Sequence, residues 1–294
     1  KVFSTIDGKS TSYFYIFDAI ASTIAGFTFV INGYIPMILC FLCCTLSTII
    51  SFKFRHTTIV QNKVEPIKFT KYMEQLRTSF RYCLKSKRLK CLIMFNALLT
   101  GTIIGIVNLR SSILEEVGVP EQYFGIIFAI LQITAAIFTR NTDKIQDGLK
   151  NRTLAWLGLS TTISCIVIGF VGQDELSKSS FILIVTLLAI QYMSKGPYMG
   201  LITRYLNNFT NRHIRPKISA LRYLTANLST AIISLICSGL LSITTTATTF
   251  TIIGCITTIG IVVLLDYMRD KVGLKPEEYS KEDIRYSINK PELK

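Results

Sequence analysis

Long apolar runs dominate this chain and constrain its fold more than any other feature. Half of its 294 residues are hydrophobic, whereas 17% are charged. A helix needs about 20 mainly apolar residues to cross a bilayer. Eight stretches have this character, at residues 12–32, 34–52, 91–109, 123–139, 153–172, 181–203, 218–241 and 247–268. Gly, Ser and Thr are scattered through them, as in closely packed membrane helices. The sequence therefore predicts an all-α, polytopic bundle of eight membrane helices.

The positive charges predict the orientation of these spans, because cytoplasmic loops of membrane proteins are enriched in Lys and Arg. If the chain starts in the cytoplasm and the spans alternate, all but two of the 32 Lys and Arg residues fall on the cytoplasmic side. The two exceptions are Arg110 and Lys178. We therefore expect both ends of this segment in the cytoplasm. The net charge of +14 then needs no nucleic-acid partner.

One long connection divides the spans into two groups. Residues 53–90 form a basic loop between the first two spans (1–52) and a six-span unit (91–268), and residues 269–294 form a tail. We expect the loop and the tail to be cytoplasmic.

The second part of this loop has the pattern of an amphipathic helix. Met73, Leu76, Phe80 and Leu84 recur at helical spacing among basic residues. Helices of this kind lie on the membrane surface. The alternative is a solvated linker helix.

The two groups of spans contain an apparent repeat. Residues 9–30 and 217–238 both begin with Lys, continue through aromatic residues to a polar one, Asp18 or Asn227, and reach a run of small residues. Transporters are often built from repeated groups of helices. The first two spans thus resemble the last two of the six-span unit. This pattern predicts a twelve-span protein of which the chain lacks the first four spans.

Several stretches resemble the major facilitator superfamily. FKFRHTTIVQNKVEPIKF (52–69) is similar to the central loop of that family, and VGVPEQYFG (117–125) to the outer loop before span eight. TRNTDKIQDGLKNR (139–152) resembles a degenerate copy of the inner loop between spans eight and nine. NRHIRPKISALRYL (211–224) resembles the loop into span eleven, where Arg215 fits a common Arg position beside Lys217.

The resemblance implies spans five to twelve of a transporter whose two six-helix bundles rock around a central cavity. It covers nearly all of the chain and is silent on substrate. The stretch KGPYMGLITRYLNNFTN (195–211) most resembles uncharacterised transporters of low-GC Gram-positive bacteria. Spans 91–109 and 181–203 correspond to cavity-lining helices of the family. Together these features predict a multi-pass protein of the plasma membrane, monomeric at full length, that moves a small solute.

Ionisable residues inside a span each cost about 2.5–3.5 kcal/mol on insertion scales. Three of them are candidates for a role in transport, whereas Asp266, near the inner end of the last span, is interpreted as interfacial. Asp18, Lys195 and Arg222 are all expected in the inner third of the membrane. We hypothesise that Asp18 pairs with Lys195 or Arg222 and closes an inner gate. In the alternative, the two cations extend to the interface and Asp18 bonds locally.

Uncharged polar residues inside the spans are further candidates. Asn96 and Gln191 lie on helices expected to face the cavity and are the better candidates for solute contact; Gln132 and Asn227 are weaker ones. Such side chains also bond between helices without touching solute.

Gly196 and Pro197 interrupt a predicted span. Proline removes a helical hydrogen bond and favours a kink. The kink would serve either function or packing.

No cofactor or metal site is expected. Cys40, Cys43 and Cys44 lie in an apolar run without partner histidines, so they are interpreted as small apolar residues. Proton coupling would need a titratable group on the pathway. Asp18 is the carboxylate placed well inside a span of this chain, and the alternative is an acid in the four spans that the pattern predicts to be missing. Two other classes remain open: a polytopic membrane enzyme, such as a lipid or glycan transferase, and a non-transporting scaffold or receptor.

Overall fold

The protein is a bundle of long helices. The computed structural model describes residues 2–53, 69–149, 152–173, 178–210 and 214–269. The elements are α1 (Val2–Ile31), α2 (Tyr34–Ser51), α3 (Phe69–Lys85), α4 (Lys87–Glu116), the short 3-10 helix η1 (Glu121–Tyr123), α5 (Phe124–Arg140), α6 (Thr142–Leu149), α7 (Thr153–Val171), α8 (Lys178–Asn208), α9 (Arg215–Leu241) and α10 (Thr246–Arg269). Among the described residues, eight helices are long and apolar enough to span a membrane: every α-helix except α3 and α6. This confirms the predicted all-α bundle of eight membrane helices.

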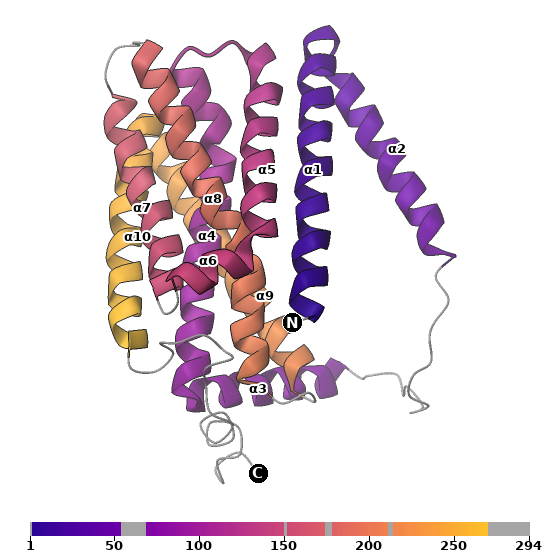
Figure 1. The fold of residues 1–294 in the computed structure, drawn as a ribbon, viewed down its shortest axis with the longest axis vertical. Helices are drawn as coiled ribbons and strands as arrows, with labels where there is room; N and C mark the ends of the chain where they lie inside the picture. Colours follow the sequence, from indigo (N-terminus) through magenta and orange to yellow (C-terminus); the bar gives the residue numbers. More distant parts are fainter. Residues whose placement is uncertain (1, 54–68, 150–151, 174–177, 211–213, 270–294) are drawn as a thin grey trace.

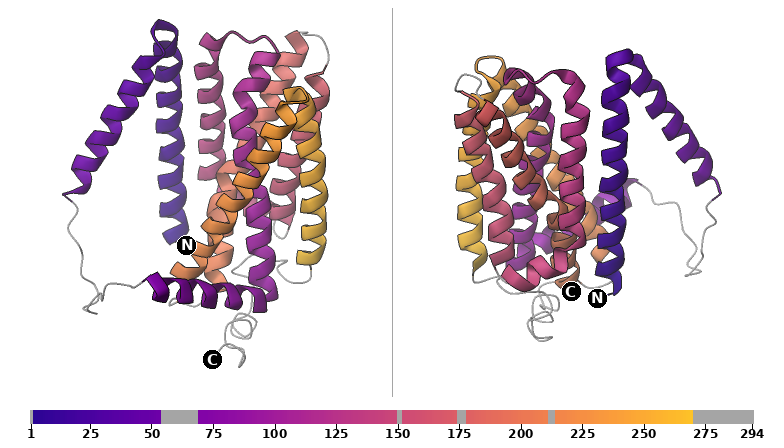
Figure 2. Two further views of the ribbon diagram at one scale, coloured as in Figure 1. Left: turned by 180° about the vertical axis from the view of Figure 1, so that it is seen from behind. Right: turned by 45° about the horizontal axis from the view of Figure 1, so that its top comes forward.

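The helices form one bundle with two further helices at its side. Helices α4, α5, α7, α8, α9 and α10 stand together, with α7 packed on α10, α4 on α9 and α5 on α8 (Figure 1). Helix α1 packs along α5, whereas α2 leans away from α1 and has no buried residue (Figure 2). The short helices α3 and α6 lie across the end of the bundle where α1 and α4 begin.

The contact between α1 and α5 is made largely by small residues. A Cβ atom built on Gly26 would lie 2.7 Å from the Cα of Gly125, so the two backbones touch. Nearer the start of α1, the Ser12 hydroxyl donates to the Ala136 carbonyl oxygen at 3.1 Å. Close approach through small residues is the usual way in which membrane helices associate, because lipid gives no hydrophobic drive.

Helix α4 extends beyond the span predicted at 91–109. Its start is capped by the Ser86 side chain, which accepts from the Leu89 N–H at 3.5 Å. Its end is set by Gly118, whose φ of 75° and hydrogen bond to the Glu115 carbonyl oxygen form the usual glycine-terminated helix end. No earlier residue stops the helix. Arg110, expected in an outer loop, therefore lies inside α4.

Helix α8 is also longer than predicted and continues through Gly196 and Pro197. Because it runs on to Asn208, Lys195 lies near the middle of the helix rather than close to its inner end. The position predicted for Lys195 in the inner third of the membrane stays a prediction.

Helix α3 occupies the place predicted for an amphipathic helix. It packs on α4 and α9, with Tyr82 and Cys83 buried and Met73, Phe80 and Leu84 exposed. Residues of α3 and α9 together line an open groove of about 750 Å³. Its position on a membrane surface stays a prediction. The first part of the predicted central loop and the tail after residue 269 lie outside the described residues.

Candidate transport site

Arg110 is the centre of a charged and aromatic cluster inside the bundle. Its Nη1 donates a hydrogen bond to the hydroxyl of Tyr192 on α8. Its guanidinium carbon lies 3.8 Å from the centre of the Phe128 ring on α5. A cation over an aromatic face gains about 0.5–2 kcal/mol. Arg110 thus connects α4 to α5 and α8, and α4 carries a partly buried charge that the sequence had placed in an outer loop.

Lys195 extends into the same region from α8. Its Nζ lies 4.8 Å from the centre of the Tyr192 ring and 5.7 Å from the centre of the Tyr15 ring on α1. Both Asp18 and Arg110 act on it electrostatically. Lys195 therefore belongs to one cluster with Arg110, and that cluster reaches across to α1.

Asp18 faces α5 from α1. Its Oδ2 accepts a hydrogen bond from the Nε2 of Gln132. Among the described residues, no ion pair joins Asp18 to Lys195 or to Arg222. The structure brings Asp18 and Lys195 into one region, while Arg222 bonds elsewhere. The gate pairing hypothesised from sequence stays a prediction.

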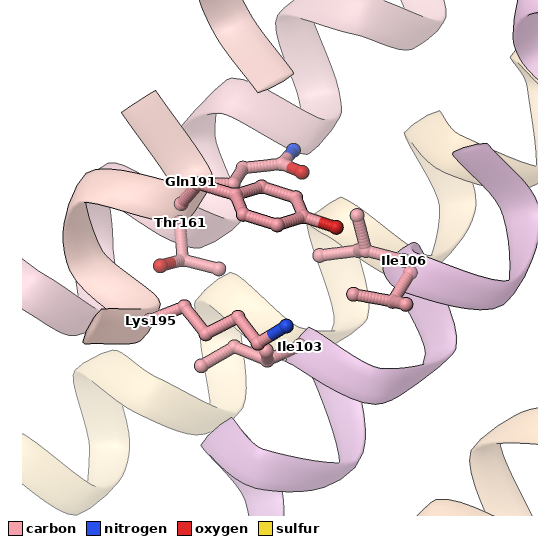
Figure 3. Close-up of a pocket in the computed structure, with 7 residues that line it drawn as sticks. Ile103, Ile106, Thr161, Gln191 and Lys195 are labelled. Carbon is pink, nitrogen blue, oxygen red and sulfur yellow. The ribbon is translucent and has the colours of Figure 1, made fainter. Parts of the chain in front are cut away.

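A small pocket lies beside Lys195 (Figure 3). It is lined by Ile103, Ile106 and Val107 of α4, Thr161 of α7, and Gln191, Tyr192 and Lys195 of α8. Its free space of about 10 Å³ is the least that holds one water molecule. The pocket is therefore closed to a solute in this structure, although its lining combines one cation with polar and apolar side chains.

Two buried amide oxygens around this cluster have no hydrogen-bond partner in the part of the chain that the structure describes. They are Oε1 of Gln191 and Oε1 of Gln132. Gln191 is 3% exposed, and its amide nitrogen donates to the Cys165 sulfur at 3.5 Å. An unsatisfied buried acceptor costs about 1–3 kcal/mol. Both amides were singled out from sequence, and both have free capacity to accept a hydrogen bond.

Asn96 is bound within the bundle. Its Oδ1 accepts from the Tyr198 hydroxyl at 3.2 Å and from the Thr100 hydroxyl at 3.4 Å. The bond from Tyr198 connects α8 to α4, whereas the bond from Thr100 lies within α4. The role of Asn96 as a solute contact stays a prediction.

The candidates on α9 lie apart from the cluster. Arg222 is buried and donates to the Thr203 hydroxyl at 2.7 Å. Arg215 donates through Nε to the Thr210 carbonyl oxygen at 3.2 Å. Lys217 and Asn227 are exposed. The roles predicted for these residues in a gate or in topology stay predictions.

Gly196 allows α5 and α8 to approach closely. A Cβ at this position would lie 2.5 Å from the Ala135 carbonyl oxygen. Pro197 follows inside the unbroken helix. This contact gives Gly196 a packing role, which was one of the two alternatives.

An ion pair that sequence reasoning missed connects α6 to α8. Arg204 Nη2 donates to Asp143 Oδ1 at 2.7 Å, and its Nη1 donates to Gln146 Oε1 at 2.6 Å. The motif-like stretch 139–152 pointed to α6, but nothing in the sequence identified the partner on α8.

The described residues contain no group of three or more His, Cys, Asp or Glu side chains placed to hold a metal ion. The chemistry available in the cluster is binding chemistry: two cations, one carboxylate, two tyrosines and two amides.

Comparison with protein families decides the class of this bundle. The family model described as Major Facilitator Superfamily matches residues 89–291, which is more than half of the chain. The chain belongs to the Major Facilitator Superfamily. The match begins in α4 and includes every later helix, so Arg110 and Lys195 lie in the matched region. Helices α1, α2 and α3 precede it, and with them Asp18 and Tyr15.

Membership of the Major Facilitator Superfamily makes the protein a multi-pass membrane protein of a transporter family, a family that is typically not enzymatic. It does not favour the membrane enzyme or the scaffold. No curated protein matches the chain, and no solved structure does.

Proposed function

We propose that this protein is a secondary active transporter that moves a small solute by alternating access between two helix bundles. The observation that carries the proposal is the position of the charged cluster. Arg110 and Lys195 lie in the six-helix bundle, whereas Asp18 and Tyr15 come from α1, which packs against its side. Charged groups at a boundary between packed bodies respond to their relative movement.

We also infer that α1 and α2 are the last two spans of an N-terminal bundle and that residues 91–268 form the C-terminal one. The exposed surface of α2 supports this division, as does a family match that begins at residue 89. The assignments to spans five to twelve, to the plasma membrane, to a monomer and to a low-GC Gram-positive source are parts of the same proposal. So is the cytoplasmic location of both ends of this segment.

Alternating access can be tested at the contact between α1 and α5. Replacing Ser12 and Ala136 by Cys places two thiols where side chain and backbone now lie 3.1 Å apart. In the full-length protein, with other cysteines replaced by Ser, oxidation should abolish solute-driven currents in proteoliposomes and reduction should restore them. Each single-Cys variant is the control. Currents that persist in the oxidised double variant would contradict a movement at this contact.

The inner gate has its own test. In the full-length protein, Asp18→Lys should reduce transport, and a second change, Lys195→Asp or Arg222→Asp, should restore part of it if the charges pair during the cycle. Failure of both combinations would rule the gate out and leave Asp18 as the partner of Gln132.

We propose no cofactor, and we assign any proton coupling to Asp18. An Asp18→Asn variant should then lose transport driven by a pH gradient and keep solute exchange, because the carboxamide cannot carry a proton. Retention of proton-driven transport by this variant would move the coupling group elsewhere.

A further inference from the structure

The cluster around Arg110 and Lys195 carries more positive than negative charge. Both cations lie on helices that span the bundle. Within the described part of the chain, Asp18 is the carboxylate that interacts electrostatically with Lys195, and Asp18 is already bound by Gln132. The positive charges of Arg110 and Lys195 therefore share one carboxylate, which already accepts a hydrogen bond from Gln132. Charged groups in the apolar part of a membrane protein are paired or line a solute pathway.

The partners of the two cations are aromatic rather than anionic. Arg110 rests on the Phe128 ring and donates to the Tyr192 hydroxyl. The Lys195 ammonium lies over the rings of Tyr15 and Tyr192. An aromatic face is a weaker partner for a cation than a carboxylate or a phosphate, which binds through charge-assisted hydrogen bonds. A ligand anion can therefore replace these contacts.

A second observation indicates that the ligand also carries a hydrogen-bond donor. Gln191 lines the pocket with Lys195 and is almost fully buried, yet its Oε1 has no partner among the described residues (Figure 3). Gln132, which binds Asp18, has the same unsatisfied oxygen. An amide oxygen accepts hydrogen bonds and cannot donate them. The amide oxygen can therefore accept a hydrogen bond from a ligand hydroxyl, but it cannot bind an anionic oxygen.

We propose that this cluster is the binding site for a small hydroxylated organic anion. This inference rests on the proposed transport function and names its substrate class. Arg110 and Lys195 bind the carboxylate or phosphate group, and the Gln191 oxygen accepts from a hydroxyl of the same molecule. The family resemblance found in the sequence is by itself silent on substrate.

The size of the pocket limits when the anion binds. Free space of about 10 Å³ does not admit an organic acid. Binding therefore requires the cluster to open. Movement of α1 away from the six-helix bundle, which alternating access supplies, would separate the Tyr15 ring from Lys195. The structure shows the site closed around its own aromatic side chains.

Matched probes separate the two features of the ligand. Lactate carries a carboxylate and a hydroxyl, propionate lacks the hydroxyl, and lactamide lacks the charge. Glycerol 3-phosphate and glycerol form the corresponding pair for a phosphate. The melting temperature (Tm) of the purified full-length protein is measured against the concentration of each probe.

We expect a saturable rise in Tm of several degrees with lactate or glycerol 3-phosphate, because a ligand that binds the folded state stabilises it. The uncharged probes should have no effect, and propionate should bind at least about tenfold more weakly than lactate if lactate is the better probe. Comparison of the rise in Tm with lactate and with glycerol 3-phosphate identifies whether the site accepts a carboxylate or a phosphate group. Absence of a saturable rise with both hydroxylated anions would overturn the proposal.

Variants locate the binding. Lys195→Gln and Arg110→Gln should each remove the rise in Tm. Lys144→Gln is the matched control, because it removes an exposed positive charge on α6. If Arg110→Gln does not fold, Arg110→Lys is the alternative. It keeps the positive charge but lacks the planar set of N–H donors of the guanidinium group, so it should bind the anion more weakly. An unchanged response in the variants at both positions would place the anion elsewhere and overturn the site.

A measurement without ligand gives an independent test. Lys195→Met keeps most of the side chain and removes a positive charge that has no anionic hydrogen-bond partner among the described residues. We expect the Tm of the unliganded variant to equal or exceed that of the wild type. A fall in Tm of several degrees would show that Lys195 is instead held by Asp18 as a structural pair, and would overturn the assignment.

Uptake of radiolabelled probes into vesicles with an imposed pH gradient separates this inference from the proposed function. Uptake of glycerol that the anions do not inhibit would contradict the anion site and leave transport standing. Anion-dependent protection without uptake of any probe would support the site and contradict transport.

Discussion

Gly26 on α1 and Gly125 on α5 lie backbone to backbone. A Cβ on Gly125 would lie 2.7 Å from the Ser22 carbonyl oxygen and 2.8 Å from the Cα of Gly26, distances that side chains do not tolerate. Gly125→Ala should therefore separate the two helices and cost about 1–3 kcal/mol, the usual range for overpacking. Thermal unfolding of the purified protein measures this loss.

The control for Gly125 is Gly239 on α9, because a Cβ there would meet nothing within 4 Å. Gly239→Ala should leave the Tm unchanged or raise it, since alanine has the higher helix propensity. Equal losses for the two variants would show that the α1–α5 contact contributes no more than an exposed helical position.

The hydrogen bond between Arg110 and Tyr192 should contribute measurably to stability. Tyr192→Phe keeps the ring near Lys195 and removes the hydroxyl that accepts from Arg110. Hydrogen bonds to charged groups contribute about 1.5–3 kcal/mol, so we expect a fall in Tm of several degrees. Tyr123→Phe, at an exposed tyrosine, is the control. No difference between the two variants would contradict the bond.

The ion pair between Arg204 and Asp143 should contribute little by itself, because the Asp143 side chain is 56% exposed. Asp143→Asn should cost at most about 1 kcal/mol, and less at high salt. A double-mutant cycle with Arg204→Gln measures the coupling. A coupling well above 1 kcal/mol would show that the pair is shielded from water and stabilises the α6–α8 contact strongly.

Cys83 on α3 should be a slow thiol. Burial raises its pKa to about 11; Lys90 opposes this change and Cys91 adds to it. Thiolate is the reactive form, so alkylation at pH 8 should be about 100-fold slower than for an unperturbed cysteine and should accelerate as pH rises toward 11. Mass spectrometry after labelling with N-ethylmaleimide reports the rate at this residue.

The unfolded protein supplies the reference for Cys83. In denaturant its reaction rate should rise to that of an ordinary cysteine. Equally fast labelling in the native protein at pH 8 would mean that α3 does not stay packed on α4 and α9.

Glu116 at the end of α4 binds the start of α10. Its Oε2 accepts from the Thr246 N–H at 2.8 Å, where a carboxylate also interacts favourably with the helix dipole. Glu116→Gln should therefore cost about 0.3–1 kcal/mol. The neighbouring Glu115→Gln is the control, since Glu115 is exposed and contributes its backbone to the helix end. A larger effect at Glu115 would contradict the cap.

The long apolar runs were sufficient to predict the architecture. Their number and order agree with the eight membrane-length helices, because length and hydrophobicity alone decide whether a segment can span a bilayer. The helix ends were harder to predict. Gly118 was the signal for the end of α4, and a reading that stopped at the first charge, Arg110, shortened the helix.

The site was only partly predictable for the same reason. Lys195, Gln191 and Gln132 were identified because polar residues in spans are rare and informative. Arg110 was missed once it had been assigned to a loop. The aromatic partners Phe128 and Tyr192 gave no signal, since aromatic residues in a membrane helix more often contact lipid or core. Only the packing of α5 and α8 against α4 reveals them.

Helix α5 makes a close glycine contact on each of two sides, with Gly26 of α1 and with Gly196 of α8. At both contacts one backbone lies directly on another at the glycine position. An axial shear of α1 or α8 against α5 therefore acts directly on the α5 backbone. Such a shear displaces Phe128 and Gln132 together, and these residues touch Arg110 and Asp18. A small axial movement of one helix would thus change the surroundings of both charges at once.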